Sequence, residues 1–135
     1  MLRMAQTEIS AIQRICQDLE LPVGDSFTQD WAYELPEEFR HEAALYRYLS
    51  AYTSKGYGAN EKRLLVQLAL DIVNDLLQQE EEVGGRAWSA LADLLRMNHG
   101  LHRDQVEYWS VVGEPLEDAF ALTPLARALW EELYA

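Results

Sequence analysis

Two pairs of residues have both the types and the spacing of metal ligands. Glu38 and His41 are three residues apart, so both would project from one face of a helix and could reach a single ion. His99 and His102 have the same separation at an expected helix boundary. A di-iron carboxylate bundle needs two Glu-x-x-His pairs, and zinc needs a third ligand that the sequence does not single out. We therefore expect no metal and no cofactor, and we interpret these histidines as surface and helix-capping residues.

Glu42 is the least expected residue on the helix predicted over about 36–53, because apolar and aromatic side chains surround its angular position. A carboxylate on an apolar stripe lowers stability unless it is paired or hydrogen-bonded. We interpret Glu42 as one half of a structural ion pair with an arginine, with a tyrosine hydroxyl as a further option. The alternative is a site carboxylate with a raised pKa in a cleft. That alternative makes Glu38, His41, Glu42 and Tyr46 the site cluster of a small helical enzyme or metal-binding protein.

The chain shows no motif for nucleophilic catalysis or nucleotide binding. Cys16 falls on the apolar stripe of the first expected helix, where a thiol is usually a packing residue. No serine has a Gly-x-Ser-x-Gly setting, and residues 56–58 lack the third glycine of a dinucleotide fingerprint. We assign no catalytic residue. One group of tyrosines is a candidate binding surface: Tyr46, Tyr48, Tyr52 and Tyr57.

The chain is strongly acidic. Among 135 residues, 11 Lys and Arg stand against 23 Asp and Glu, which gives a formal net charge of −12. A protein that tracks phosphates or binds an anionic membrane needs the opposite sign, so we expect neither nucleic acid nor membrane as a partner. A single cysteine excludes an internal disulfide and a Cys-rich zinc site. No targeting signal or membrane-spanning run is visible, and we expect a cytoplasmic protein.

Apolar residues recur with helical spacing along nearly the whole chain, and no alternating run predicts a sheet. Proline, glycine and capping residues mark the ends of the helices. We expect helices over about 7–20, 36–53, 60–79, 102–112 and 123–134, with another between Gly85 and Asn98. Residues 22–35 should form an irregular segment anchored by aromatic side chains. The sequence thus predicts an all-α single domain over 1–135, a bundle of about five or six helices.

The expected helix over 60–79 is apolar around most of its circumference, so neighbours should cover it on several sides. We predict that it is the central helix, with four residues among the most buried: Leu65, Leu68, Ile72 and Leu76. One narrow arc is polar, and we interpret it as a solvent-exposed face formed by Gln67, Asp71, Asn74, Asp75 and Gln78. Charge and two glycines over 80–85 should end this helix.

The acidic residues gather in two places. Asp71 and Asp75 lead into a run formed by Glu80, Glu81 and Glu82, and a second cluster consists of Glu114, Glu117 and Asp118. An acidic face speeds the capture of a basic partner, although such a run can also serve only solubility. We expect a non-enzymatic protein-binding domain, in its most specific form a cytosolic immunity-protein-like or antitoxin-like inhibitor of a basic partner such as a nuclease toxin. The alternatives are the helical metal site above and a structural subunit of a larger helical assembly. The sequence does not indicate an oligomeric state.

Overall fold

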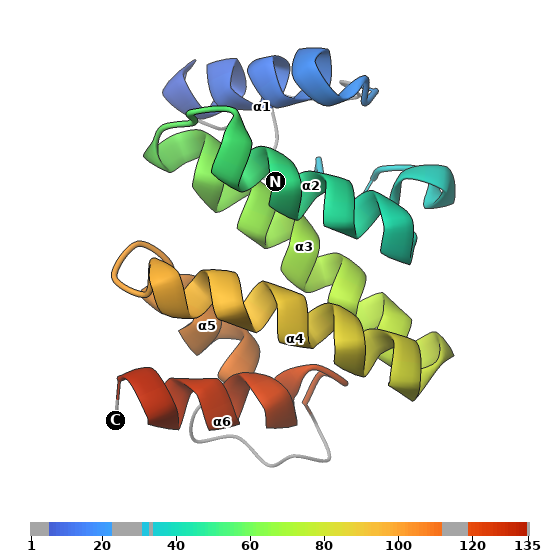
Figure 1. Ribbon diagram of the computed structural model, residues 1–135, viewed down its shortest axis with the longest axis vertical. Coiled ribbons are helices and arrows are strands. Elements are labelled where there is room, and N and C mark those ends of the chain that lie inside the picture. The colour runs from blue at the N-terminus through green and yellow to red at the C-terminus, as the bar shows by residue number, and fades with distance from the viewer. Residues whose placement is uncertain (1–5, 23–30, 33, 112–118, 135) are drawn as a thin grey trace. The chain divides into compact units, whose positions relative to one another are not determined.

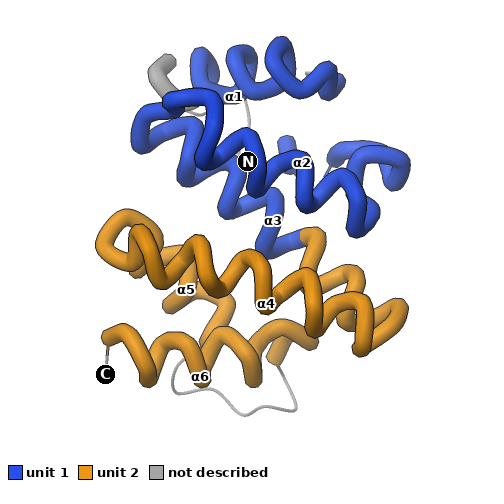
Figure 2. Tube along the Cα trace, in the orientation of Figure 1, with its two compact units in different colours: residues 1–71 blue, residues 72–135 orange. Residues whose placement is uncertain are grey.

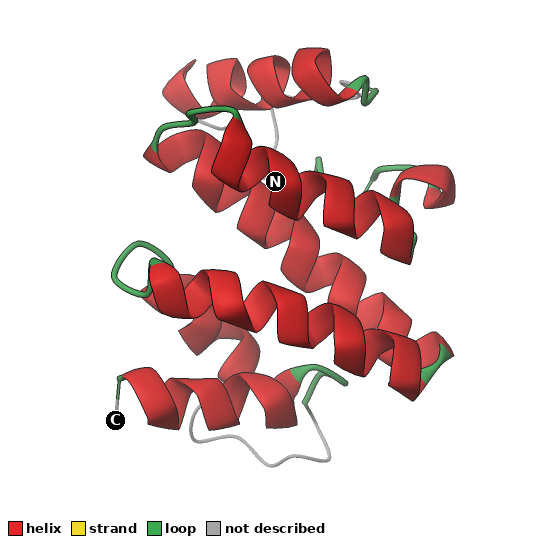
Figure 3. Ribbon diagram, viewed as in Figure 1, coloured by secondary structure: helices red, strands yellow, loops and turns green. Residues whose placement is uncertain are grey.

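The computed structural model describes residues 6–22, 31, 32, 34–111 and 119–134, which form helices joined by turns and contain no strand (Figures 1 and 3). The prediction of an all-α fold is confirmed. The helices are α1 (Gln6–Leu19), the short 3-10 helix η1 (Glu37–Phe39), α2 (Glu42–Ser54), α3 (Ala59–Gln79), α4 (Glu81–Met97), α5 (Arg103–Ser110) and α6 (Thr123–Leu133).

The chain divides into two compact units, residues 1–71 and residues 72–135, which are coloured separately in Figure 2. Their boundary falls inside α3, between Asp71 and Ile72. Fully buried apolar side chains occur in both units, among them Ile12 and Leu45 in the first and Leu91 in the second. That residues 1–135 act as a single domain stays a prediction.

The helix α1 ends at a residue in the left-handed backbone conformation. Glu20 has a left-handed φ of 56°, and the Leu21 amide donates to the Cys16 carbonyl at 2.9 Å. In the irregular segment that follows, Trp31 is buried and its Nε1 donates to the Pro22 carbonyl at 3.2 Å. Of the aromatic side chains expected to anchor this segment, Trp31 is confirmed, and Leu35 is buried with it, whereas Phe27 and Tyr33 lie outside the described residues.

The predicted helix over 36–53 is wrong at its start, because two shorter elements replace it. Residues 37–39 form η1, and α2 begins only at Glu42. His41 separates them in an extended conformation, and its Nδ1 accepts the Ala44 amide at 3.1 Å, which caps α2. The Tyr48 hydroxyl donates to the Phe39 carbonyl at 2.5 Å, so a side chain satisfies a group that an unbroken helix would pair itself.

The long helix α3 confirms the predicted core and corrects the predicted polar face. Its four residues expected to be most buried are at most 6% exposed: Leu65, Leu68, Ile72 and Leu76. Asp71 and Asn74, however, are also buried, at 5% and 7% exposed. Asp71 pairs with Arg40, and the Asn74 Oδ1 accepts the Leu122 amide at 3.0 Å. Both partners come from distant parts of the sequence, so helical periodicity alone assigned these residues wrongly to a solvent-exposed arc.

The predicted break over 80–85 is reduced to one residue. Glu80 alone is extended between α3 and α4, with φ −154° and ψ 106°, and both glycines lie inside α4. Gly84 is buried against the last turn of α3. An added Cβ would stand 2.6 Å from the Leu77 nitrogen and 2.7 Å from its Cα. Gly84 therefore permits a close approach of two helix backbones and does not break the helix.

In the second unit, α5 packs against α6, and side-chain hydrogen bonds connect the two helices. The chain leaves α5 at Val111, whose φ of 46° is left-handed. Arg127 on α6 donates from Nε to the Ser110 carbonyl and from Nη2 to the Val111 carbonyl, each at 2.7 Å. The Thr123 hydroxyl donates to the Trp109 carbonyl at 2.8 Å. These contacts fix the start of α6 to the end of α5.

Candidate functional site

The metal-ligand arrangement that was the alternative for Glu38 and His41 is not formed. Glu38 lies in η1, and His41 lies beyond the end of that helix as the N-cap of α2. The two residues therefore do not share a helix face, and the His41 Nδ1 is occupied by the Ala44 amide. Among the described residues, no three His, Cys, Asp or Glu side chains are grouped closely enough to hold a metal ion.

Glu42 is the first residue of α2 and not a carboxylate buried within an apolar stripe. Its side chain is partly exposed, and its Oε2 accepts the Tyr46 hydroxyl at 2.8 Å. A carboxylate in the first turn also interacts favourably with the positive end of the helix. The tyrosine hydroxyl that was the further option for Glu42 is thus one of its partners.

A buried pair of a carboxylate and an arginine, of the kind expected at Glu42, occurs at Asp71. The Arg40 Nη2 donates to the Asp71 Oδ2, and the side chains are 10% and 8% exposed. The Arg40 Nη1 also donates to the Ala32 carbonyl at 2.6 Å, which joins the irregular segment to this pair. Asp71 is therefore not available to an exposed acidic face, and its interpretation as a partner-binding residue is wrong. Removing one partner of a buried pair of this kind lowers stability strongly, because the other charge stays buried without its counterion.

The predicted tyrosine surface is also wrong, because three of its members are buried. Tyr48, Tyr52 and Tyr57 are at most 4% exposed, and only Tyr46 is exposed. The Tyr57 hydroxyl donates to the Asp18 Oδ2 at 2.8 Å. A tyrosine hydroxyl that reaches a polar partner can be buried, so a cluster of tyrosines does not by itself indicate a surface.

The remaining candidate residues are the cysteine and the two histidines near the start of α5. Cys16 is buried, and burial raises the pKa of its thiol to about 11, opposed by a hydrogen bond with Trp31. The packing interpretation of Cys16 is confirmed. His99 and His102 lie between α4 and α5, as predicted. His102 is fully buried with its Nδ1 2.7 Å from the Gln105 Oε1, while His99 is exposed.

Three predicted acidic residues are exposed together at the start of α4. Glu80 is the N-cap of this helix, and Glu81 and Glu82 form its first turn. We call these residues the acidic run. No lysine or arginine in the described part of the chain pairs with them. Asp75 is partly buried in α3, and the second predicted cluster, Glu114, Glu117 and Asp118, lies outside the described residues.

A groove lies beside the acidic run in the second unit. It has a volume of about 430 Å³ and is bounded by the end of α3, the start of α4 and the start of α6. We call it the α4–α6 groove. Its walls are mostly apolar, with one carboxylate: Leu77, Glu81, Gly85, Ala121, Pro124 and Leu125. Glu81 and Gly85 are four residues apart, so they share the face of α4 that borders the groove.

The charges around the groove favour a cation. A helix N-terminus carries about half a positive charge, which the three glutamates of the acidic run outweigh. The start of α6 offers few donors for an anion. The Leu122 amide donates to Asn74, the Thr123 amide donates to the Phe120 carbonyl at 3.1 Å, and Pro124 has no N–H. The groove is therefore an apolar space with a negative rim.

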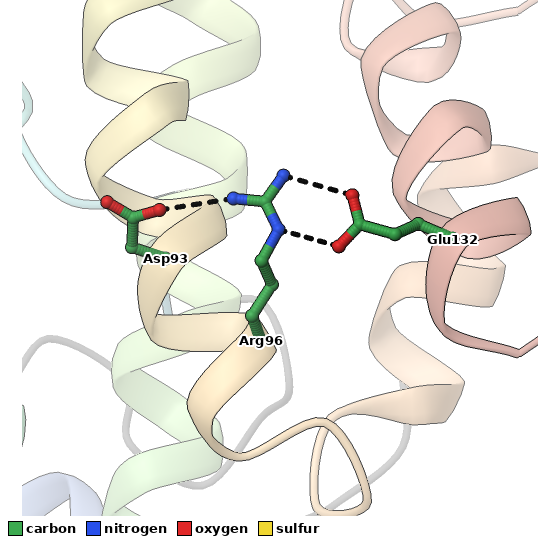
Figure 4. Close-up of polar contacts among 3 residues, drawn as sticks. All are labelled: Asp93, Arg96 and Glu132. Atoms are coloured by element: carbon green, nitrogen blue, oxygen red, sulfur yellow. Dashed lines mark hydrogen bonds and ion pairs between the residues drawn. The ribbon is translucent and has the colours of Figure 1, made fainter.

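An ion-pair cluster joins α4 and α6 near their other ends, away from the groove (Figure 4). The Arg96 Nε donates to the Glu132 Oε2 at 2.7 Å and its Nη2 donates to Oε1 at 3.3 Å. The Arg96 Nη1 also donates to the Asp93 Oδ1 at 3.1 Å. Hydrogen bonds from Arg96 hold the pKa of the Glu132 carboxyl below its usual range. The cluster links α4 to α6 beyond the groove.

Sequence reasoning found the acidic run but missed the apolar part of the groove. The wall formed by residues 121–125 is remote in the sequence, and no local pattern relates it to α4. One signal was present: Glu81 and Gly85 have i, i+4 spacing. It was hidden because the two glycines were interpreted as the end of a helix.

Comparisons with known proteins do not place the chain in a group: no family model, no curated protein and no solved structure matches it. Within the described residues, no helix has the length and apolar character needed to cross a membrane. The groove and its acidic rim are therefore the observations from which function is inferred.

Proposed function

We propose that this chain is a non-enzymatic protein-binding domain that captures a basic partner. The observation that carries the proposal is the exposed acidic run beside an apolar groove. In its most specific form the protein is a cytosolic inhibitor of the immunity-protein or antitoxin kind, which covers a basic surface such as that of a nuclease toxin. The net charge of −12 supports this choice of partner.

The two parts of the site suit two stages of binding. Exposed carboxylates act over distance, so they raise the association rate with a basic protein and repel acidic ones. An apolar groove acts only after contact, when it removes apolar surface of the partner from water. Association should therefore depend strongly on salt, whereas dissociation should depend mainly on packing in the groove.

The test compares two triple variants that remove the same number of charges. Glu80, Glu81 and Glu82 are changed to glutamine in one variant, and the exposed Glu34, Glu37 and Glu38 in the other. Proteins captured by the wild type from native extract are identified, and association of the purified partner is followed at two salt concentrations. We expect the captured partner to be basic and its association to slow as salt rises, because exposed charges are screened over about 8 Å at physiological ionic strength. Association should also be much slower with the Glu80, Glu81 and Glu82 variant than with the control variant.

Two results would contradict the proposal. The first is salt-independent association, and the second is equal behaviour of the two triple variants, which would leave the acidic run as a solubility feature. Unfolding of each variant is measured alongside, since loss of first-turn glutamates alone should lower helix stability only slightly.

One observation favours the assembly-subunit alternative as a second candidate. Tyr108 and Phe120 are 59% and 37% exposed, and their ring centroids are 5.8 Å apart. Exposed aromatic pairs are common at protein interfaces. If this surface is buried in an assembly, the purified chain should self-associate in sedimentation experiments, and Tyr108→Ser should make it monomeric. A monomer at high concentration would remove this candidate.

A further inference from the structure

Gly85 is the residue of the α4–α6 groove that packing within the chain does not explain. Glycine inside a helix lowers its stability relative to alanine. At Gly84 the fold requires glycine, because a Cβ would meet the Leu77 backbone at 2.6 Å. At Gly85 a Cβ would have no atom of the described residues within 4 Å. The missing side chain at Gly85 therefore leaves open space on the wall of the groove.

The groove around this space has the chemistry of a pocket for a long cationic side chain. Leu77, Leu125 and Pro124 provide apolar surface, which suits a methylene stem. Glu81 lies one helical turn before Gly85 on the same face, so it can receive a positive head group at the rim. Lysine and arginine combine these two parts, because their stems bury against apolar surface while the charged ends stay at the edge. The volume of about 430 Å³ falls within the range of ligand clefts.

We propose that the α4–α6 groove holds one lysine or arginine side chain of the basic partner, with its stem against Leu77 and Leu125 and its charged end at Glu81. This inference rests on the proposed function and names the residue type that the site recognises. The acidic run would then have two roles: Glu80 and Glu82 contribute only to the long-range field, while Glu81 also makes a direct contact.

The test uses small probes that represent each part of the side chain. Pentylammonium and butylguanidinium stand for lysine and arginine, and 1-pentanol and pentanoate are neutral and anionic controls. Binding to the full chain is followed by ¹⁵N–¹H NMR titration. We expect both cations to shift amides of Gly85 and Leu125 most strongly. The alcohol should bind more weakly, and pentanoate should not bind.

Matched variants separate direct contact from the general field. Glu81→Gln should weaken pentylammonium binding about two- to fivefold and leave 1-pentanol unchanged. Glu82→Gln removes the same charge from the neighbouring residue, which does not line the groove, and should change neither probe by more than about twofold. Gly85→Leu should abolish binding of both probes by filling the open space, and circular dichroism checks its fold. Gly85→Ala provides a smaller obstruction of the same space.

Several results would overturn the inference. They are 1-pentanol binding as tightly as pentylammonium, equal effects of the Glu81 and Glu82 variants, shifts outside the groove, or no binding at all. The outcome is distinguishable from failure of the proposed function. Salt-dependent capture of a basic partner without probe binding would remove only the groove assignment. Probe binding without any basic partner would remove only the proposed function.

Discussion

Gly84 and Gly85 are neighbours in α4, but alanine should have opposite effects at the two positions. At Gly84 the new methyl group would lie 2.6 Å from the nitrogen of Leu77 and 2.7 Å from its Cα. These are backbone atoms, so no change of rotamer relieves the overlap, and the first turn of α4 must move away from α3. At Gly85 the same methyl group meets no atom within 4 Å in the part of the chain that the structure describes.

The magnitudes follow from two opposing contributions. Alanine in place of glycine stabilises a helix interior by about 0.5–1 kcal/mol when nothing opposes it, which is the gain expected for Gly85→Ala. At Gly84 overpacking costs about 1–3 kcal/mol, and the overlap with backbone atoms puts it at about 2–3 kcal/mol, so subtracting the gain of about 0.5–1 kcal/mol leaves a net loss of about 1–2.5 kcal/mol. Because the same residue is replaced in the same helix, the unfolded-state contributions nearly cancel. The difference between the variants therefore measures the close approach of α3 and α4.

Urea unfolding followed by circular dichroism and by tryptophan fluorescence provides the assay, with midpoints compared at equal m. In thermal unfolding, each kcal/mol should shift Tm by about 3–5 °C for a chain of this size. A Gly84→Ala variant as stable as the wild type would show that the backbones do not meet at Leu77. A Gly85→Ala variant as damaged as Gly84→Ala would show that the wall of the groove is packed, and it would refute the reasoning about both glycines.

Four further predictions test the rest of the fold. Leu68→Ala should lower the unfolding free energy by about 2–5 kcal/mol because it leaves a cavity at a fully buried site, and a loss below ~1 kcal/mol would mean that α3 is oriented differently. Val111→Gly should raise Tm, since glycine relieves a left-handed φ of 46° in a β-branched residue by about 1 kcal/mol; a lower Tm would contradict this. Asp71→Asn should lower the unfolding free energy, measured by urea unfolding, by about 3–5 kcal/mol because it removes the carboxylate that pairs with the buried Arg40 guanidinium, and a neutral result would contradict a buried pair. Burial raises the pKa of Cys16 from 9.0 to about 11, so the unfolded chain loses this proton first, and the Cys16 contribution to stability should be constant below pH 9 and fall as the pH rises towards 11. Cys16→Ala should reduce this loss of stability without abolishing it, because the raised pKa values of Tyr48 and Tyr57 act in the same direction, and an equal loss in both proteins would contradict the reasoning.

Features with a strong local cause could be predicted from the sequence. The periodicity of α1 and α3 follows from apolar residues that recur every three or four positions, and the start of α6 follows from Pro124 in its first turn. The expectation that Thr123 is the N-cap is wrong, because Leu122 is the N-cap and the Thr123 hydroxyl donates to the Trp109 carbonyl. These signals depend only on neighbouring residues. The all-α class and the buried side of α3 were therefore accessible without a structure.

Features that depend on distant partners could not be predicted in this way. A polar residue on a helical wheel looks the same whether it faces water or a buried arginine, so the pairing of Asp71 with Arg40 was invisible. Histidine is not a typical N-cap residue, so the sequence did not indicate that a helix begins after His41. Two successive glycines usually predict a break, yet Gly84 lies in α4 because the Leu77 backbone occupies the space of its side chain. The groove could not be predicted either, because it lies between the start of α4 and the start of α6, which are far apart in the sequence.

The turn from α3 to α4 explains why the acidic run and the groove occur together. Because Glu80 alone connects the two helices, α4 begins directly beside the last turn of α3, and Gly84 allows that approach. A helix start is also where carboxylates are most favourable, so Glu81 and Glu82 stabilise the helix that they make negative. Substituting these glutamates therefore changes stability and charge together. Gly85 is different, because packing among the described residues does not require glycine at this position. Substitutions of Gly85 are therefore the sharper test of whether the groove binds a partner.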